Sequence, residues 1–205
     1  LIAGRPKLGK TTLLRQKMAA MAAGVEFLDS RFEQPVTAAF LCLEEGERLA
    51  KAKFELANFT EAALAGVRLF FEWPRGMEGV DLLDRYFDAN PEVGYAGIDS
   101  LTKFRTVPDA KTPAFIADYE AMSMLHELTK RRPGLVIDVV HHTRKAQSDD
   151  PIDDISGTYG LTAAVDSYMV LRAHADGAVM HVGGRLWDRE ISEYKIRRAN
   201  QRWEM

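Results

Sequence analysis

The sequence has one cysteine, no long apolar run and little net charge, and each scarcity excludes a class of protein. Cys42 alone can form no internal disulfide and argues against a cysteine-based zinc site. No apolar run approaches the roughly twenty residues that span a bilayer, so no membrane partner is expected. Cytoplasmic localisation, in a reducing compartment, is the expectation that follows.

A formal charge of −3 gives the chain no overall basic field. Any contact with nucleic acid must then come from a local patch or from a ring of subunits. The 205 residues, 46% of them apolar, fit one globular domain over residues 1–205. Because only Leu1, Ile2 and Ala3 precede the first motif, we expect that the parent protein continues upstream and that these residues end its first core strand.

The most informative feature is the segment GRPKLGKT at residues 4–11, a complete G-x-x-x-x-G-K-[ST] phosphate-binding loop. Its glycines let the backbone curl so that N–H groups surround a phosphate, and the following helix adds its positive end. Lys10 is expected to neutralise phosphate oxygens, and Thr11 to offer its hydroxyl to Mg²⁺. The expected nucleotide-binding residues are Gly4, Arg5, Pro6, Lys7, Leu8, Gly9, Lys10, Thr11 and Thr12.

Apolar runs alternate with amphipathic stretches, which predicts an α/β fold with a mostly parallel central sheet flanked by helices. After Gly157 three strand-like runs with short connections predict an antiparallel extension. The predicted helices are 11–23, 47–59, 79–89, 115–131 and a short one near Leu161, and the predicted strands are 36–43, 67–72, 95–101, 135–142, 167–172, 178–185 and 191–196.

Two of the predicted strands end in carboxylates. Asp99 closes the apolar run that begins at Tyr95, and the carboxyl edge of a parallel sheet is where α/β ligands bind. We expect Asp99 to support Mg²⁺ beside Thr11, although capping of the next turn is an alternative. Glu44 and Glu45 follow the strand 36–43, which we expect beside the phosphate loop; Glu44 is the expected base that orients water, and ordinary helix-capping electrostatics is the alternative.

A third strand ends in His141 and His142. A histidine here can hydrogen-bond the γ-phosphate and change its contacts after hydrolysis, so it would be a sensor. Neighbouring residues on a strand point to opposite faces, so only one of the two faces the nucleotide, and the sequence does not say which. The stretch 144–155 that follows is polar, contains four aspartates and is expected to be mobile; its Arg144 can reach phosphates.

Together these residues resemble the RecA-like ATPases, and among them the RepA-type hexameric helicases of plasmid and phage replication. The resemblance covers nearly the whole chain through GRPKLGKTT, LCLEEGERLAK, YAGIDSLTKF, VVHHTRK and ISGTYGLTAAVDSYMVLR, in that order. It implies ATP and Mg²⁺ as cofactors, with Lys10 and Thr11 on the phosphates and metal. It also implies that Glu44 activates water, that Asp99 supports the metal and that His141 or His142 senses the γ-phosphate. The family often has Glu-Asp where this chain has Glu44-Glu45, which leaves the second carboxylate's role open.

In the family that the sequence resembles, the nucleotide lies between subunits and a neighbour supplies an arginine. Arg185, after a glycine pair, is the first candidate and Arg172 the second; a solvated hairpin arginine is the alternative. Four basic residues are expected either to line a ring pore or to lie on a solvent-exposed surface: Lys195, Arg197, Arg198 and Arg202. Trp187 and Trp203 are expected to pack in the core or an interface rather than stack on bases.

The resemblance implies a homo-oligomeric ring, expected to be hexameric, that hydrolyses ATP and moves along single-stranded DNA as a replicative helicase. A second hypothesis is a nucleotide-switched module that binds DNA or a protein without unwinding. A small-molecule kinase is disfavoured because no arginine-rich lid is evident between Thr102 and Pro113.

Overall fold

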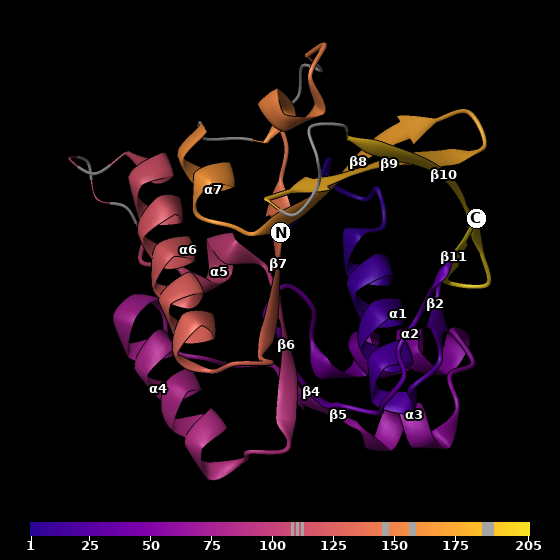
Figure 1. The fold of residues 1–205 in the computed structure, drawn as a ribbon, viewed down its shortest axis with the longest axis horizontal. Helices are drawn as coiled ribbons and strands as arrows, with labels where there is room; N and C mark the ends of the chain where they lie inside the picture. The colour runs from indigo at the N-terminus through magenta and orange to yellow at the C-terminus, as the bar shows by residue number, and fades with distance from the viewer. Residues whose placement is uncertain (108, 110, 112, 145–147, 156–158, 186–190) are drawn as a thin grey trace.

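The computed structural model describes residues 1–107, 109, 111, 113–144, 148–155, 159–185 and 191–205. Within these residues a nine-stranded sheet lies between two layers of helices (Figure 1). The strands of this sheet are β1 Ile2–Gly4, β4 Thr37–Cys42, β5 Val67–Phe70, β6 Val93–Asp99, β7 Val136–His142, β8 Ser167–His174, β9 Gly177–Gly184, β10 Ser192–Ala199 and β11 Arg202–Glu204. The helices are α1 Lys10–Ala23, α2 Glu47–Leu56, α3 Glu61–Ala65, α4 Gly76–Ala89, α5 Leu101–Phe104, α6 Ala114–Arg131, η1 Pro151–Asp154 and α7 Tyr159–Ala163.

The strand order is β11-β10-β9-β8-β1-β7-β6-β4-β5. All neighbours from β8 to β5 are parallel, whereas β8, β9, β10 and β11 pair antiparallel. This order confirms the predicted parallel sheet with its antiparallel extension. The tail strand at the start of the chain is β1, and it lies in the middle of the sheet between β7 and β8.

One expectation about this order was wrong. The strand that precedes the acidic pair, β4, is not beside the strand that leads into the phosphate loop, because β7 and β6 lie between them. The chain moves outward from β1 to β4, and its later crossovers bring β6 and then β7 back toward β1. The acidic pair therefore reaches the loop along the sheet edge, and not from a neighbouring strand.

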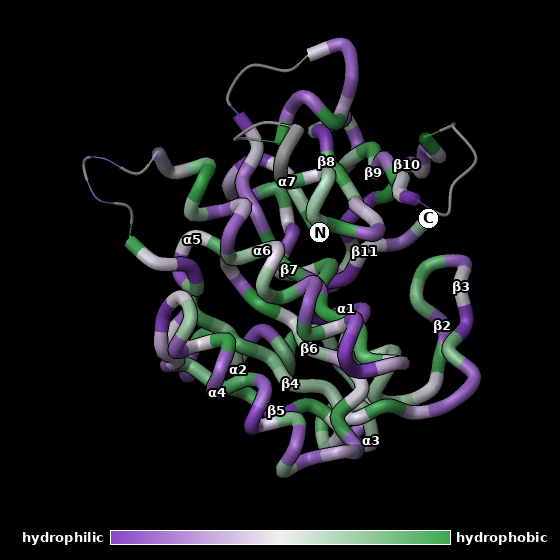
Figure 2. Tube along the Cα trace, turned by 60° about the vertical axis from the view of Figure 1, so that its left-hand side comes forward, coloured by the Kyte–Doolittle hydropathy of each residue, from purple (hydrophilic) through white to green (hydrophobic). Residues whose placement is uncertain are grey.

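Each face of the sheet has its own apolar core. On one face, α1 buries Leu14 and Met18 against strand residues such as Phe40. On the other face, α4 and α6 bury Leu83 and Leu125 together with Ile98. Figure 1 shows these two groups of helices on opposite sides of the strands, and in Figure 2 the green, hydrophobic stretches run along the central strands. The residues of a strand alternate between the two cores because successive side chains point to opposite faces.

Several short elements were missed by the sequence prediction. They are α3, α5, β11 and a small hairpin of β2 Glu26–Phe27 and β3 Ser30–Arg31. The predicted strand 95–101 ends at Asp99, because Leu101 already begins α5, and the predicted helix 47–59 ends at Leu56. No helix in the described ranges has both the length and the apolar character needed to cross a bilayer.

The polar stretch after β7 contains local structure in its described part. Residues 145–147 lie outside the described part, but residues 148–155 contain the single turn η1. There the Asp154 carboxylate is 3% exposed, accepts a hydrogen bond from Arg172 Nε at 2.8 Å and receives the Ser148 hydroxyl. A buried carboxylate with such partners holds its segment in place, which an acidic composition alone did not indicate.

Candidate nucleotide-binding site

Four predicted motifs meet at the carboxyl edge of the parallel strands. β1 leads into the phosphate loop, β7 ends at His142, β6 ends at Asp99 and β4 is followed two residues later by Glu44. The registers place Gly4 opposite His142 and Cys42 opposite Asp99, so the strand ends are level with one another. Parallel strands in the order β1-β7-β6-β4 thus gather these polar groups along one line.

The phosphate loop has the backbone shape that anion binding requires. Lys7 and Gly9 have positive φ angles of 65° and 91°, and Gly9 caps the start of α1. A Cβ at Gly9 would come within 2.7 Å of the Trp203 ring, so only glycine fits there. Alternating backbone conformations of this kind form a concave nest of N–H donors at a helix N-terminus.

Lys10 lies inside this loop. Its Nζ atom donates to the carbonyl oxygens of Gly4 and Arg5, at 2.8 and 2.9 Å. The residue is 5% exposed, and burial lowers the pKa of Lys10 to about 8, against the opposing effect of Asp99 and Glu44. An anionic ligand would stabilise the charged form of this buried ammonium, which its burial disfavours. This agrees with the predicted role of Lys10 in binding phosphate.

The structure distinguishes the two histidines that the sequence left as alternatives. His142 Nδ1 lies 3.2 Å from Lys10 Nζ, whereas His141 is 3% exposed and belongs to the other face of β7. Because an ammonium only donates, this contact needs a neutral His142 with Nδ1 as acceptor. Burial lowers the pKa of His142, and the neighbouring Lys10 charge lowers it further, which agrees with a neutral ring.

Thr11 and Asp99 form the pair that was expected around Mg²⁺. The Thr11 hydroxyl donates to Asp99 Oδ2 at 2.5 Å. Asp99 is 2% exposed, and burial raises its pKa to about 6, opposed by the Thr11 hydrogen bond and reinforced by Glu44. A buried carboxylate whose charge is disfavoured, next to a hydroxyl oxygen, is a donor set that fits Mg²⁺. The described residues contain no cluster of three or more acidic, histidine or cysteine side chains suited to a metal, so phosphate oxygens would complete the shell.

The two adjacent glutamates have different surroundings. The Ser100 hydroxyl donates to Glu44, which is exposed at the site edge. Glu45 instead accepts from Arg15 of α1 at 3.0 Å and pairs with Lys53 of α2. The two cations that contact Glu45 belong to α1 and α2, so this carboxylate links the two helices. Glu44 is therefore the glutamate available to the site. Sequence reasoning gave no role to Ser100, although it follows Asp99 in the motif YAGIDSLTKF, and it missed Arg15, which belongs to no motif.

The candidate arginines lie at opposite edges of the sheet. Gly184 pairs with Ser167 at the start of β8, so Arg185 follows at the edge away from the phosphate loop. It donates to the Ala163 carbonyl oxygen at 2.6 Å and is 55% exposed at its side chain. Arg172 is near the loop edge, one residue after the partner of Gly4, but it is paired with Asp154. The structure therefore does not bring Arg185 to the loop of its own chain.

The basic residues of the last two strands make contacts within the chain. Arg198 donates to the Thr12 hydroxyl at 3.3 Å, Arg197 pairs with Glu204, and Arg202 donates to the Ala57 carbonyl oxygen at 2.6 Å. Trp203 is 3% exposed and packs in the core, while Trp187 lies outside the described residues.

The sequence of residues 1–148 matches the family described as AAA domain. The chain belongs to this AAA domain family. Its fold, a mostly parallel sheet between helices with antiparallel C-terminal strands, is the RecA-like P-loop ATPase fold, which confirms the resemblance to RecA-like ATPases and the predicted fold class. Comparison with curated proteins finds no significant match.

Two solved structures show how widely this AAA domain fold is shared. A DnaB-like replicative helicase, whose structure describes its interactions with primase, is similar over 100% of this chain with a TM-score of 0.74 and 12% identity. The match takes up 56% of that helicase chain, so the domain spans little more than half its length. A KaiC-like protein from Pyrococcus horikoshii OT3 is similar over 99% of this chain and 87% of its own, with a TM-score of 0.62 and 12% identity.

Proposed function

We propose that this AAA domain hydrolyses ATP and uses the energy to move along single-stranded DNA, as the motor of a RepA-type hexameric replicative helicase. The observation that carries the ATPase part is the meeting of Lys10, Thr11, Asp99, Glu44 and His142 at one sheet edge. The motor part is supported by the fold that the domain shares with a DnaB-like replicative helicase.

Each of these residues has a distinct task in the proposed reaction. The loop N–H groups and Lys10 hold the β- and γ-phosphates. Thr11 and Asp99 would hold Mg²⁺, which neutralises phosphate charge when bound. Glu44, fixed by Ser100, accepts a hydrogen bond from the attacking water and orients it toward the γ-phosphate. His142 exchanges its contact with Lys10 for one with the γ-phosphate, and so registers whether that phosphate is present.

Ring assembly supplies the remaining charge in this proposal. Arg185 is exposed at the edge of the sheet opposite to its own loop, so it can serve only the site of a neighbouring copy. A closed ring of identical subunits places such an edge against the next phosphate loop by rotation. A partner arginine then stabilises charge in the transition state.

The alternative function is a nucleotide-switched module without unwinding, and the fold shared with a KaiC-like protein supports it. Both functions use the same nucleotide site. They differ in what changes the hydrolysis rate: a translocating motor is stimulated by DNA, whereas a switch assembles with nucleotide and shows little stimulation.

Steady-state ATP hydrolysis with and without single-stranded DNA tests the proposal. We expect the rate of ATP hydrolysis to rise strongly with DNA. We expect Lys10→Ala to lower that rate at least about 100-fold, because the phosphates lose their buried cation. Full hydrolysis by Lys10→Ala would refute the site. Hydrolysis that does not respond to DNA would favour the switch.

A further inference from the structure

The last strand of the domain lies directly under the phosphate loop. Trp203 of β11 donates its indole Nε1–H to the Gly9 carbonyl oxygen at 3.1 Å. The two are in close contact, because a Cβ on Gly9 would overlap the Trp203 ring. A residue almost two hundred positions away along the chain thus contacts the loop at its most constrained point.

The Gly9 carbonyl is held by two donors. Leu13 N–H donates to the same oxygen at 2.9 Å as the first hydrogen bond of α1. Because a trans peptide unit is planar, with its C=O and N–H pointing in opposite directions, fixing the Gly9 carbonyl also fixes the direction of the Lys10 N–H. That N–H is one of the donors at the start of α1 that face a bound phosphate. Trp203 therefore orients a phosphate-binding group without facing the phosphate itself.

β11 is itself fastened to the nucleotide-binding helix. The Gln16 side chain of α1 donates through Nε2 to the Trp203 carbonyl oxygen at 2.9 Å, and the Trp203 N–H donates to Gln16 Oε1 at 2.7 Å. A carboxamide paired with both backbone groups of one residue acts like an added strand. This pairing fixes the distance between α1 and β11, and hence where the indole meets the loop.

Two further contacts set the position of β11. Its hairpin with β10 turns through Asn200 and Gln201, both with positive φ, as a tight two-residue turn requires. Arg202 donates to the Ala57 and Asn58 carbonyl oxygens, and its guanidinium lies 4.5 Å from the Phe59 ring centroid. The strand is therefore held by the segment after α2 as well as by α1.

We propose that Trp203, aligned by Gln16, is a positioning residue that sets the phosphate-binding shape of the loop. This inference rests on the proposed function, since it deepens the account of the same nucleotide site. The loss of one net hydrogen bond should weaken nucleotide binding about 2- to 12-fold. The oriented N–H serves ATP and the transition state alike, so kcat should stay within roughly twofold.

The test compares two tryptophans with the same kind of hydrogen bond. Trp73 donates its indole N–H to the Gly79 carbonyl oxygen at 2.9 Å, beside α4 and away from the loop. Kd for ATP, kcat and melting temperature are measured for Trp203→Phe and for the control Trp73→Phe. We expect both to melt slightly lower, and only Trp203→Phe to raise Kd.

Equal Kd values for Trp203→Phe and Trp73→Phe would overturn the positioning role and leave Trp203 as packing. If neither the wild-type protein nor Trp73→Phe binds ATP, the proposed function fails instead, so the two failures can be told apart.

A second measurement leaves Trp203 unchanged, in case its replacement prevents folding. The chain has three tryptophans, so Trp73→Phe combined with Trp187→Phe leaves Trp203 as the only indole. Saturating ADP with Mg²⁺ should change its fluorescence emission, because the indole N–H donates to the Gly9–Lys10 peptide unit, whose own N–H faces the bound phosphate. No change at saturation would contradict the inference. Gln16→Met, which removes both hydrogen bonds from α1, should reduce the change.

Discussion

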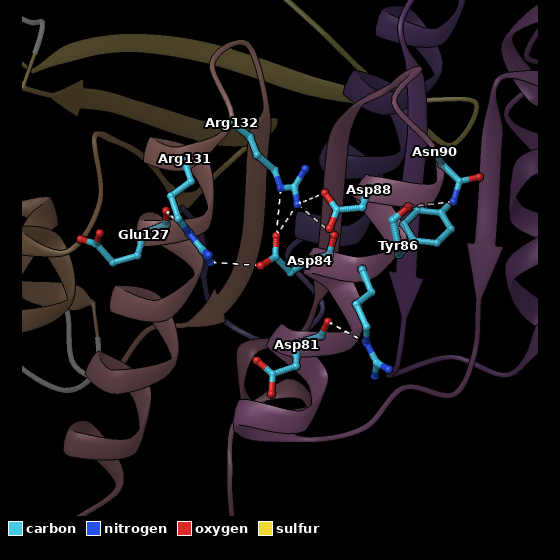
Figure 3. A network of polar contacts seen from close by, with 9 residues as sticks. Asp81, Asp84, Tyr86, Asp88, Asn90, Glu127, Arg131 and Arg132 are labelled. Atoms are coloured by element: carbon cyan, nitrogen blue, oxygen red, sulfur yellow. Dashed lines mark hydrogen bonds and ion pairs between the residues drawn. The ribbon is translucent and has the colours of Figure 1, made fainter.

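Ionisable side chains at the two edges of the parallel strands have pKa values shifted in opposite senses: the charged form is favoured at one edge and disfavoured at the other. At the amino edge, Arg132 donates to Asp84 at 3.0 Å and to Asp88 at 2.7 Å, and Arg131 pairs with Asp84, so α4 and α6 are tied together (Figure 3). These hydrogen bonds raise the pKa of Arg132. At the carboxyl edge, burial moves the pKa values of Lys10 and Asp99 toward neutrality, to about 8 and about 6.

The difference separates a network that serves the fold from a site that serves a ligand. Around Arg132 the carboxylates of Asp84 and Asp88 are paired within the chain, and these pairs favour the charged form of Arg132. Around Lys10 and Asp99 the charged forms are disfavoured, and an anion or cation from outside would relieve them.

The largest effect expected is on catalysis at the carboxyl edge. Glu44→Gln should lower kcat by about 100-fold or more while ATP still binds, because an amide orients water poorly and cannot take its proton. Single-turnover hydrolysis and ATP binding measure this. The adjacent Glu45→Gln is the matched control, and it should keep kcat but lower the free energy of unfolding by about 1–3 kcal/mol, since Arg15 loses its charged partner. Equal kcat values for the two variants would contradict the assignment of Glu44 to catalysis and of Glu45 to structure.

A smaller effect is expected at Asp99, where replacing a residue of the site should raise the free energy of unfolding rather than lower it. The native state holds this proton more tightly than the unfolded chain, so Asp99 makes the free energy of unfolding fall as pH rises from 3.8 to about 6. Asp99→Asn should remove this slope and stabilise the nucleotide-free protein at pH 7 by roughly 1–3 kcal/mol. Urea unfolding at pH 4, 5, 6 and 7 measures the slope, and an unchanged pH dependence would show that Asp99 is not the titrating group.

The smallest effect is expected at the amino edge. Arg132→Met should lower the free energy of unfolding by about 1 kcal/mol, because partly exposed ion pairs contribute little each. Hydrolysis should be unchanged. A double-mutant cycle with Asp84→Asn measures the coupling. A loss of ATP turnover in Arg132→Met would show that the two edges are not independent.

Much of this site could be predicted because its motifs fall where strands end. The phosphate loop, Asp99 and Glu44 are short signals in sequence, and the parallel sheet brings such signals to one edge. The choice between His141 and His142 could not be made, since it depends on which face of β7 meets Lys10. Long-range pairs such as Gln16 with Trp203 leave no local pattern at all.

For the fold, too, some elements could be predicted from the sequence and others could not. Long elements with clear periodicity, such as α1 and β7, were found within one residue at each end. The position of β4 in the sheet was not, because the order of strands depends on crossovers rather than on the strand's own residues. The three-residue β11 was missed since two polar residues flank its only buried one, Trp203.

Cys42, buried in β4 opposite Asp99, gives this domain an internal reporter. Burial raises the pKa of its thiol to about 12, so the thiolate that reacts with alkylating reagents is scarce while β4 stays paired. The rate of labelling at this single thiol therefore measures how often the end of β4 opens. Labelling with and without nucleotide would give the local opening free energy beside the site, without any engineered probe.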